Sequence, residues 1–281
     1  MIFDKVDTIS KSLVQHGPNN DRVYLMKINP EEHIEILMDK IYNLALFKRY
    51  TKIFTKVPER FRKVFLSHKF KLEAEVPGLY DGKEEGLFFS KYFNANRGFL
   101  NKDEKKIIGE VVETACNASG EGLATLSSAY KIRLLDERDI PAIAGIYKTI
   151  FKVYPFPIFD EKYIGEVMVS HVKFFGVEYE GEIVAVSSAE MDVENSNAEM
   201  TDFATLPAYR GKNLSYFLLQ RMIETMEQKR IKTVYTIARA KSFGMNKTFG
   251  KHGFEFGGTL IKNTLIGKSI ESINVWYKGL Q

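Results

Sequence analysis

The second half of the chain alternates short apolar runs with amphipathic stretches, and turn residues separate them. Apolar residues at every second position predict strands, whereas apolar residues three and four positions apart predict helices. These rules predict strands at residues 131–135, 172–179, 183–191, 198–206, 232–238, 254–263 and 271–277. They predict helices from Asp136 or Asp139 to about residue 151, at 161–171, from 214 onward and at 242–251. The order is that of an α/β (α+β) fold with a mixed sheet.

A basic loop joins the strand at 198–206 to the helix that begins at Leu214, whose apolar positions include Leu218 and Met222. The backbone N–H groups of a first helical turn lack partners, and the helix dipole is positive there. This helix start therefore suits an anion such as a pyrophosphate. Asn213 tolerates the left-handed backbone that the turn requires. A surface turn with two solvated cations is the plainer interpretation.

The loop resembles the acetyl-CoA loop of the GNAT superfamily of N-acetyltransferases, whose signature is Arg/Gln-x-x-Gly-x-Gly/Ala. Arg210 fits the basic position, whereas Asn213 and Ser215 stand where the family usually has Gly and Gly or Ala. The run Lys251-His252-Gly253-Phe254 is close to the Lys-x-Gly-Phe that ends the last helix of the family. With the order of elements, the resemblance covers residues 130–281 and implies an acetyl-CoA-dependent N-acetyltransferase of the GNAT fold.

The resemblance also implies how the cofactor binds. The arm of acetyl-CoA would pair with the strand residues Phe203, Ala204 and Thr205. The pyrophosphate would rest on Arg210, Gly211, Lys212, Asn213, Leu214 and Ser215. A backbone N–H of residues 203–205 is the expected donor to the tetrahedral oxyanion.

Acetyl transfer requires an amine that has lost its proton, because the pKa of an alkylammonium is about 10.4. Glu199 and Asp202 are the candidates for the base, and the resemblance favours a carboxylate on this strand. Being three residues apart, they point to opposite faces of a strand unless a β-bulge intervenes. Both stay open, as does a purely structural role for either.

The family frequently uses a tyrosine, four residues before the Gly of Gly-Phe, as the acid for the leaving thiolate. Phe249 stands there and has no proton to give. Asn246, one helical turn earlier, is therefore a candidate donor to the CoA sulfur, as are Ser242 and water.

General chemistry does not name the acceptor amine. The stretches 199–205, 238–246 and 274–278 resemble GNAT enzymes that acetylate the N6 amine of β-lysine, which makes the compatible solute Nε-acetyl-β-lysine. A zwitterionic acceptor implies acids for its ammonium groups, with Glu190 and Asp192 as candidates. Arg239 is the candidate for its carboxylate, although a salt bridge or a solvent contact is the plainer explanation of this side chain. Asn263 and Asn274 are weaker candidates.

Two other functions stay open. One is a GNAT enzyme for a different amine, such as a polyamine, another amino acid or a protein lysine. The other is a non-catalytic acetyl-CoA-binding module, which the departures at Asn213 and Phe249 favour.

The first half repeats parts of the second. Leu37 falls on Leu218, and Phe65-x-x-His68-x-Phe70 falls on Phe249-x-x-His252-x-Phe254. We interpret residues 20–94 as a degenerate copy of the later half of the fold, although chance similarity stays open. Its helix start carries Glu31 and Glu32, which would repel a phosphate.

The sequence therefore predicts two domains. Residues 1–125 form a degenerate GNAT-like domain with a linker helix, and residues 126–281 form the catalytic domain. The linker helix, near residues 101–116, opens with the capping-box spacing of Asn101 and Glu104, and a linker follows at 117–122.

Composition narrows the partners. The 40 basic and 36 acidic residues are interspersed, which gives nucleic-acid binding little support. The single cysteine excludes an intrachain disulfide and fits a reducing cytosol, and the histidines show no metal-ligand spacing. No apolar stretch approaches the roughly 20 residues of a membrane span, and residues 1–5 show no signal-peptide pattern. We expect a cytoplasmic enzyme with a small-molecule amine substrate, no metal and no membrane partner; a homodimer is compatible with the sequence.

Overall fold

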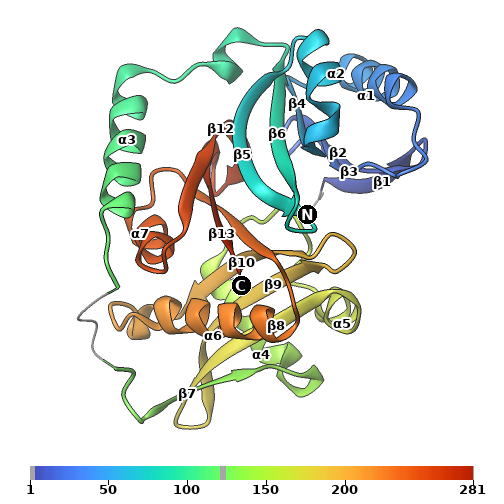
Figure 1. The fold of residues 1–281 in the computed structure, drawn as a ribbon. Helices are drawn as coiled ribbons and strands as arrows, with labels where there is room; N and C mark the ends of the chain where they lie inside the picture. The colour runs from blue at the N-terminus through green and yellow to red at the C-terminus, as the bar shows by residue number, and fades with distance from the viewer. Residues whose placement is uncertain (1–3, 121–124, 281) are drawn as a thin grey trace.

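The computed structural model describes residues 4–120 and 125–280 (Figure 1). The first residues of the chain and part of the predicted linker at 117–122 lie outside these ranges. The described strands form one thirteen-stranded mixed sheet in the order β1-β2-β3-β4-β6-β5-β12-β13-β11-β10-β9-β8-β7. Helices flank this sheet, which confirms the predicted fold class.

The C-terminal half has the predicted order of elements. It comprises β7 (Tyr130–Leu134), η3 (Glu137–Asp139), α4 (Ile140–Ile150), α5 (Glu161–Ser170), β8 (Val172–Tyr179), β9 (Glu182–Asp192), β10 (Asn197–Thr205), η4 (Pro207–Tyr209), α6 (Leu214–Gln228), β11 (Thr233–Arg239), α7 (Phe243–Lys251), β12 (Glu255–Ile266) and β13 (Ser269–Gly279). Of the two predicted capping residues, Asp136 accepts from the backbone N–H of Arg138 and caps η3, whereas Asp139 precedes α4 and makes no side-chain cap there.

The helices cover the two faces of this half-sheet. Leu214, Leu218 and Met222 of α6 are buried in one core, together with Phe249 of α7. The other face carries α4 and α5, which pack in a second core. The apolar spacing of α6 therefore confirms the predicted helix and its buried face.

The N-terminal half comprises β1 (Lys5–Ile9), β2 (Ser12–Gly17), β3 (Arg22–Lys27), α1 (Ile34–Lys48), β4 (Lys52–Pro58), η1 (Glu59–Phe61), α2 (Arg62–Ser67), β5 (Lys71–Tyr80), β6 (Glu84–Tyr92), η2 (Ala95–Gly98) and α3 (Lys102–Cys116). The capping box predicted for α3 is present in both directions between Asn101 and Glu104. This helix packs against α7 of the other half (Figure 1).

The two halves share a pattern of strand pairing. β3 runs parallel to β4, which pairs with β6 and then β5; β10 runs parallel to β11, which pairs with β13 and then β12. At the start of α1, Glu32 accepts hydrogen bonds from the backbone N–H of Lys11 and from Ser12 Oγ, at 2.8 and 2.9 Å. The turn between β1 and β2 therefore contacts the segment between β3 and α1, which corresponds to the basic loop between β10 and α6. This supports the interpretation of residues 20–94 as a degenerate copy, which stays a proposal.

The two half-sheets meet edge to edge at β5 and β12. Ala74 of β5 pairs with Gly258 of β12 in an antiparallel register. A Cβ at Gly258 would lie 2.2 Å from the carbonyl oxygen of Glu73, so only glycine permits this approach. Inward-facing side chains of both halves, among them Phe54 and Tyr235, form a shared core next to this junction.

Candidate active site

The neighbouring strands β10 and β11 diverge toward their C-terminal ends. Their parallel pairing covers three pairs and ends with Glu199 opposite Tyr235. Beyond this pair, β11 continues along β13 as far as Arg239. A cavity of about 630 Å³ lies where the two strands separate, and its wall includes residues 201–203 and 236–239. This volume is typical of a small-molecule site.

A β-bulge brings the two candidate bases into this cavity. The register between β10 and β9 shifts between Thr201 and Ala204, and Asp202 adopts a φ of 58°. Because of this bulge, Glu199 and Asp202 both line the cavity. The structure therefore contains the β-bulge that the sequence analysis named as the condition for both carboxylates to face one side.

Three hydroxyl groups surround the Asp202 carboxylate. Tyr154 and Ser188 donate to it, the latter at 2.6 Å, and Thr201 Oγ1 lies at 3.4 Å. The side chain is buried, and burial raises its pKa although these hydroxyls act in the opposite direction. Asp202 is thereby held in one orientation.

Glu190 and Glu199 face each other across paired strands β9 and β10. Burial, together with the charges of Glu199 and Asp202, raises the pKa of Glu190 to about 8. Burial likewise raises the pKa of Glu199, whereas Lys56 and Tyr235 lower it. The site therefore concentrates acidic groups whose charged forms an ammonium group would stabilise.

The N-terminal half completes the cavity. It contributes six lining residues: Leu13, Arg22, Tyr24, Met26, Lys27 and Lys56. Lys56 Nζ donates to Tyr235 OH at 2.8 Å and lies over the tyrosine ring. The site is thus built from both halves, with acids on β9 and β10 and cations on β3 and β4.

Asp192 and Arg239, which the sequence analysis predicted to bind the acceptor substrate, line the cavity but already have partners within the protein. Lys27 Nζ lies 3.6 Å from Asp192, and Asn195 also donates to that carboxylate at 2.7 Å. The guanidinium of Arg239 binds both oxygens of Glu271, at 2.7 and 2.9 Å. The salt bridge that the sequence analysis left open is therefore present.

The basic loop has the geometry expected of an anion site. Gly211 and Asn213 have φ values of 77° and 56°, and no side chain caps the helix that begins at Leu214. Arg210 Nε donates to the carbonyl of Thr205 at 3.3 Å, and Lys212 Nζ donates to Tyr130 OH at 2.9 Å. The left-handed turn predicted at Asn213 is confirmed.

Asn246 does not fit its predicted role as a donor to the CoA sulfur. Its Nδ2 donates to the carbonyls of Arg239 and Ser242, at 2.9 and 2.7 Å. Its Oδ1 accepts from Asn274 Nδ2 and Trp276 Nε1, at 3.0 and 2.7 Å. The side chain is fully buried and has no proton left to offer. This prediction was wrong, because sequence spacing does not reveal internal partners.

Several cavity residues were missed by the sequence analysis, above all Tyr154, Tyr235, Lys56 and Arg22. Tyr154 lies between two predicted helices, in a segment to which the sequence analysis assigned no role. The cations lie far from the acids in sequence, and no motif connects them. Only the packing of the two halves brings them together.

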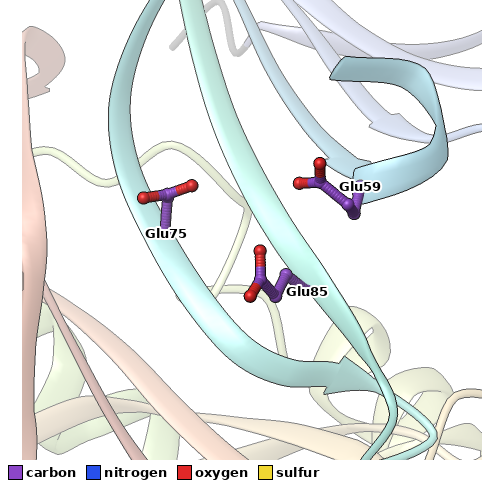
Figure 2. Close-up of side chains that lie close together, drawn as sticks. All are labelled: Glu59, Glu75 and Glu85. Atoms are coloured by element: carbon purple, nitrogen blue, oxygen red, sulfur yellow. The ribbon is translucent and has the colours of Figure 1, made fainter. Parts of the chain in front are cut away.

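A second group of acids lies in the N-terminal half. Glu59, Glu75 and Glu85 bring carboxylate oxygens within 4.8 Å of one another (Figure 2). Arg62 Nε binds Glu59 at 2.6 and 2.8 Å, Arg62 Nη2 binds Glu75, and Glu85 lies 3.6 Å away. The guanidinium therefore contacts all three carboxylates and offsets part of their charge, and the cluster lies outside the cavity.

These features define the class of protein. A model of the acetyltransferase (GNAT) family matches residues 140–254. The chain belongs to this family and is an acetyl-CoA-dependent N-acetyltransferase that acts on an amine.

Individual relatives extend the match. The chain is 33% identical to the β-lysine N(6)-acetyltransferase of Methanococcus maripaludis, over 98% of this chain and 99% of that protein. It is 38% identical to the enzyme of that name from Methanosarcina mazei, over 55% and 57% of the two chains. It is 27% identical to the N-acetyltransferase YodP of Bacillus subtilis, over 96% of each.

Solved structures resemble part of the chain. An N-acetyltransferase from Staphylococcus aureus Mu50 has a TM-score of 0.49 and 20% identity, over 55% of this chain and 100% of that chain. The ribosomal-protein-S18-alanine N-acetyltransferase of Escherichia coli has a TM-score of 0.48 and 18% identity, over 54% and 94%. Within the described residues, none of the helices combines the length and apolarity needed to cross a bilayer.

Proposed function

We propose that the enzyme transfers acetyl from acetyl-CoA to the N6 amine of β-lysine and produces Nε-acetyl-β-lysine. The observation that carries this proposal is the match, over nearly the whole of both chains, to a β-lysine N(6)-acetyltransferase. The cavity supports it because carboxylates and cations line the same space, as a zwitterionic diamine would require. Residues of both halves surround that space, which favours a small molecule over a protein lysine.

Glu199 is proposed as the base that receives the proton of the acceptor ammonium, directly or through water. It lies at the last pair before β10 and β11 separate, which is where the thioester would enter. Its pKa is raised, so that it is closer to the operating pH of a general base. Asp202, already bound by three hydroxyl groups, is proposed to hold the ammonium in place. Glu190 and Asp192 are proposed to bind the second amine.

The proposed reaction passes through a tetrahedral intermediate. The neutral amine attacks the thioester carbonyl carbon, which forms the C–N bond and an oxyanion. A backbone N–H of residues 203–205 is proposed to stabilise that oxyanion. Collapse breaks the C–S bond, the nitrogen loses its extra proton to water, and the thiolate takes a proton, so that the products are the neutral amide and the CoA thiol. Because Asn246 is fully bonded, the Ser242 hydroxyl, which lines the cavity at the start of α7, and water are the proposed sources.

Acetyl-CoA is proposed to enter between β10 and β11 with its pyrophosphate at the start of α6. The backbone N–H groups of Leu214 and Ser215 open this helix, and Gly211 and Asn213 provide the turn that exposes them. Arg210 and Lys212 are exposed beside them and would add charge-assisted contacts. No described residue is proposed to hold a metal for this chemistry.

The deciding experiment measures release of free CoA with β-lysine, lysine, spermidine and a lysine-containing peptide. The proposal expects the highest kcat/KM with β-lysine and acetylation at N6, located by mass spectrometry of the product. A preference for spermidine or the peptide would assign another acceptor. Binding of acetyl-CoA without release for any amine would favour a non-catalytic module. A role of the product as a compatible solute, a cytoplasmic location and a homodimer stay predictions.

A further inference from the structure

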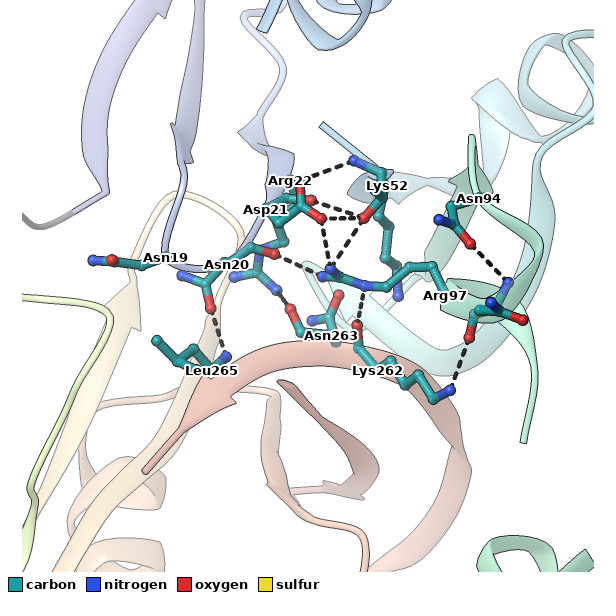
Figure 3. Close-up of polar contacts among 12 residues, drawn as sticks. Asn19, Asn20, Asp21, Arg22, Lys52, Asn94, Arg97, Lys262, Asn263 and Leu265 are labelled. Carbon is teal, nitrogen blue, oxygen red and sulfur yellow. Dashed lines mark hydrogen bonds and ion pairs between the residues drawn. The ribbon is translucent and has the colours of Figure 1, made fainter. Parts of the chain in front are cut away.

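Three buried cations lie at the junction of β3, β4 and β12: Arg22, Lys52 and Arg97 (Figure 3). Lys52 pairs with Glu73 at 3.2 Å, and Arg97 pairs with Asp21 at 3.3 Å. Arg22 is 5% exposed and makes no ion pair with any residue in the described ranges. It is also the member of the three that lines the cavity.

The partners of Arg22 leave part of its guanidinium unused. Nη1 donates to the carbonyl oxygen of Asn263 at 2.6 Å and lies 3.3 Å from Thr264 Oγ1. Nε is buried and has no hydrogen-bond partner, and the amide atoms of the neighbouring Asn263 side chain are also unpaired. The rings of Tyr24 and Phe54 lie 5.2 and 5.4 Å from the guanidinium carbon. Stacking offsets part of the cost of burial but supplies no negative charge.

Tyr24 lies close enough to both Arg22 and the carboxylate of Glu199 to feel their charges. The pKa of Tyr24 is raised by burial and by the charge of Glu199, and it is lowered by the charge of Arg22. Tyr24 is thus a neighbour of both, and all three line one cavity. The cavity is therefore polar along its length, with acids toward β10 and an unpaired cation toward β12.

We propose that Arg22, from the N-terminal half, binds the carboxylate of the acceptor and thereby selects an amino acid over a simple diamine. The inference rests on the proposed acetylation of a zwitterionic diamine. A carboxylate would supply the missing counter-ion and accept from the unused N–H groups. Arg22 is a specificity-determining residue here, and Glu199 and Asp202 remain responsible for the amine. This gives the N-terminal half a role in choosing the acceptor.

The test compares three acceptors: β-lysine, its carboxamide, and 1,4-diaminopentane, which keeps both amines and lacks the carboxyl group. In the wild-type enzyme, kcat/KM for β-lysine should exceed that for the carboxamide by about 30-fold or more, as expected for a buried charged contact. Arg22→Gln should lose this preference by lowering kcat/KM for β-lysine and leaving the carboxamide value unchanged. Arg22→Lys should restore part of it. Arg60→Gln, an exposed cation of the same half paired with Glu84, is the control and should change neither value.

Several results would overturn the proposal. Equal kcat/KM of the wild-type enzyme for β-lysine and its carboxamide would contradict the proposed carboxylate contact. The proposed N-acetylation would be unaffected by that result. An equal loss for all acceptors in Arg22→Gln, at unchanged acetyl-CoA affinity, would indicate a structural role. Loss of the preference in Arg239→Gln alone would assign the carboxylate to Arg239.

Two further measurements keep the proposals separate. Should Arg22→Gln fail to fold, the comparison of β-lysine with its carboxamide on the wild-type enzyme still tests whether the site recognises the carboxylate. Should no acceptor be acetylated, the proposed function fails. Calorimetry of β-lysine binding to wild type and Arg22→Lys in the presence of CoA then tests the carboxylate contact, and equal affinities would contradict it.

Discussion

Glu199 on β10 lies opposite Tyr235 on β11 in the last parallel pair before the two strands separate. Lys56 of the N-terminal half donates to the hydroxyl of that tyrosine at 2.8 Å. The proposed base therefore stands at the point where the strands open, within reach of a cation from the other half. This arrangement makes the catalytic assignment testable.

Glu199→Gln should lower kcat by about 100-fold or more, because general-base catalysis contributes about 10²–10⁴-fold. The acid limb of the pH profile of kcat/KM should disappear as well, since the titrating group is gone. Asp202→Asn keeps its hydroxyl neighbours and should mainly raise the KM for the amine. Steady-state kinetics across pH would measure both variants. A retained acid limb in Glu199→Gln, together with its loss in Asp202→Asn, would transfer the base to Asp202.

Glu190→Gln should stabilise the protein at alkaline pH. The pKa of Glu190 is raised to about 8 in the folded state, so the folded state holds a proton that the unfolded state loses above its ordinary pKa near 4.5. Stability therefore falls as the pH rises from about 4.5 to 8, and glutamine removes that dependence. Thermal unfolding should show a higher Tm for the variant at pH 9 and no difference at pH 4. A lower Tm at pH 9 would contradict the raised pKa.

The same substitution should leave the acid limb of kcat/KM close to its wild-type position. Glu190 holds its proton below a pKa of about 8, so glutamine removes no negative charge in the pH range of that limb. Lys56→Met should move the limb to higher pH, since a cation that lowers the pKa of Glu199 is lost. An unchanged limb in Lys56→Met would mean that this cation does not control the base.

Asn213→Val should weaken acetyl-CoA binding. Asn213 has a φ of 56°, and a β-branched residue pays about 1–2 kcal/mol in this backbone region. The Kd for acetyl-CoA should rise by about 5- to 30-fold, whereas Asn213→Gly should stay near the wild-type value. Arg49→Val carries the same strain at a φ of 57° in the other half and serves as the control for stability. Isothermal titration calorimetry would measure these affinities, and unchanged binding by Asn213→Val would remove the loop from the cofactor site.

Asn246→Ala should destabilise the protein and leave catalysis by the folded fraction unchanged. The variant leaves the buried donors of Asn274 and Trp276 without their acceptor. Each unpaired donor costs about 1–3 kcal/mol, which predicts a loss of about 2–6 kcal/mol in unfolding free energy. Thr248→Ala, on the exposed side of the same helix, should change stability by less than about 0.5 kcal/mol. Urea denaturation measures the loss; a drop in kcat with normal stability would revive the role of Asn246 as a donor.

The sequence by itself determined the elements of the C-terminal half, the buried face of α6 and the left-handed turn at Asn213. These features depend on local periodicity and backbone preference, which are properties of neighbouring residues. It also located the carboxylates at 199 and 202 and allowed for the bulge that aligns them. The family resemblance added the class of reaction.

Only the tertiary structure decided which side chains share the cavity and which are already bonded. Asn246 makes four internal hydrogen bonds, and Arg239 forms a salt bridge with Glu271. Lys56 and Arg22 reach the site from strands more than a hundred positions away from the acids in sequence. Hydrogen-bond saturation and long-range electrostatics depend on how the two half-sheets pack, and no local pattern in the chain encodes that packing.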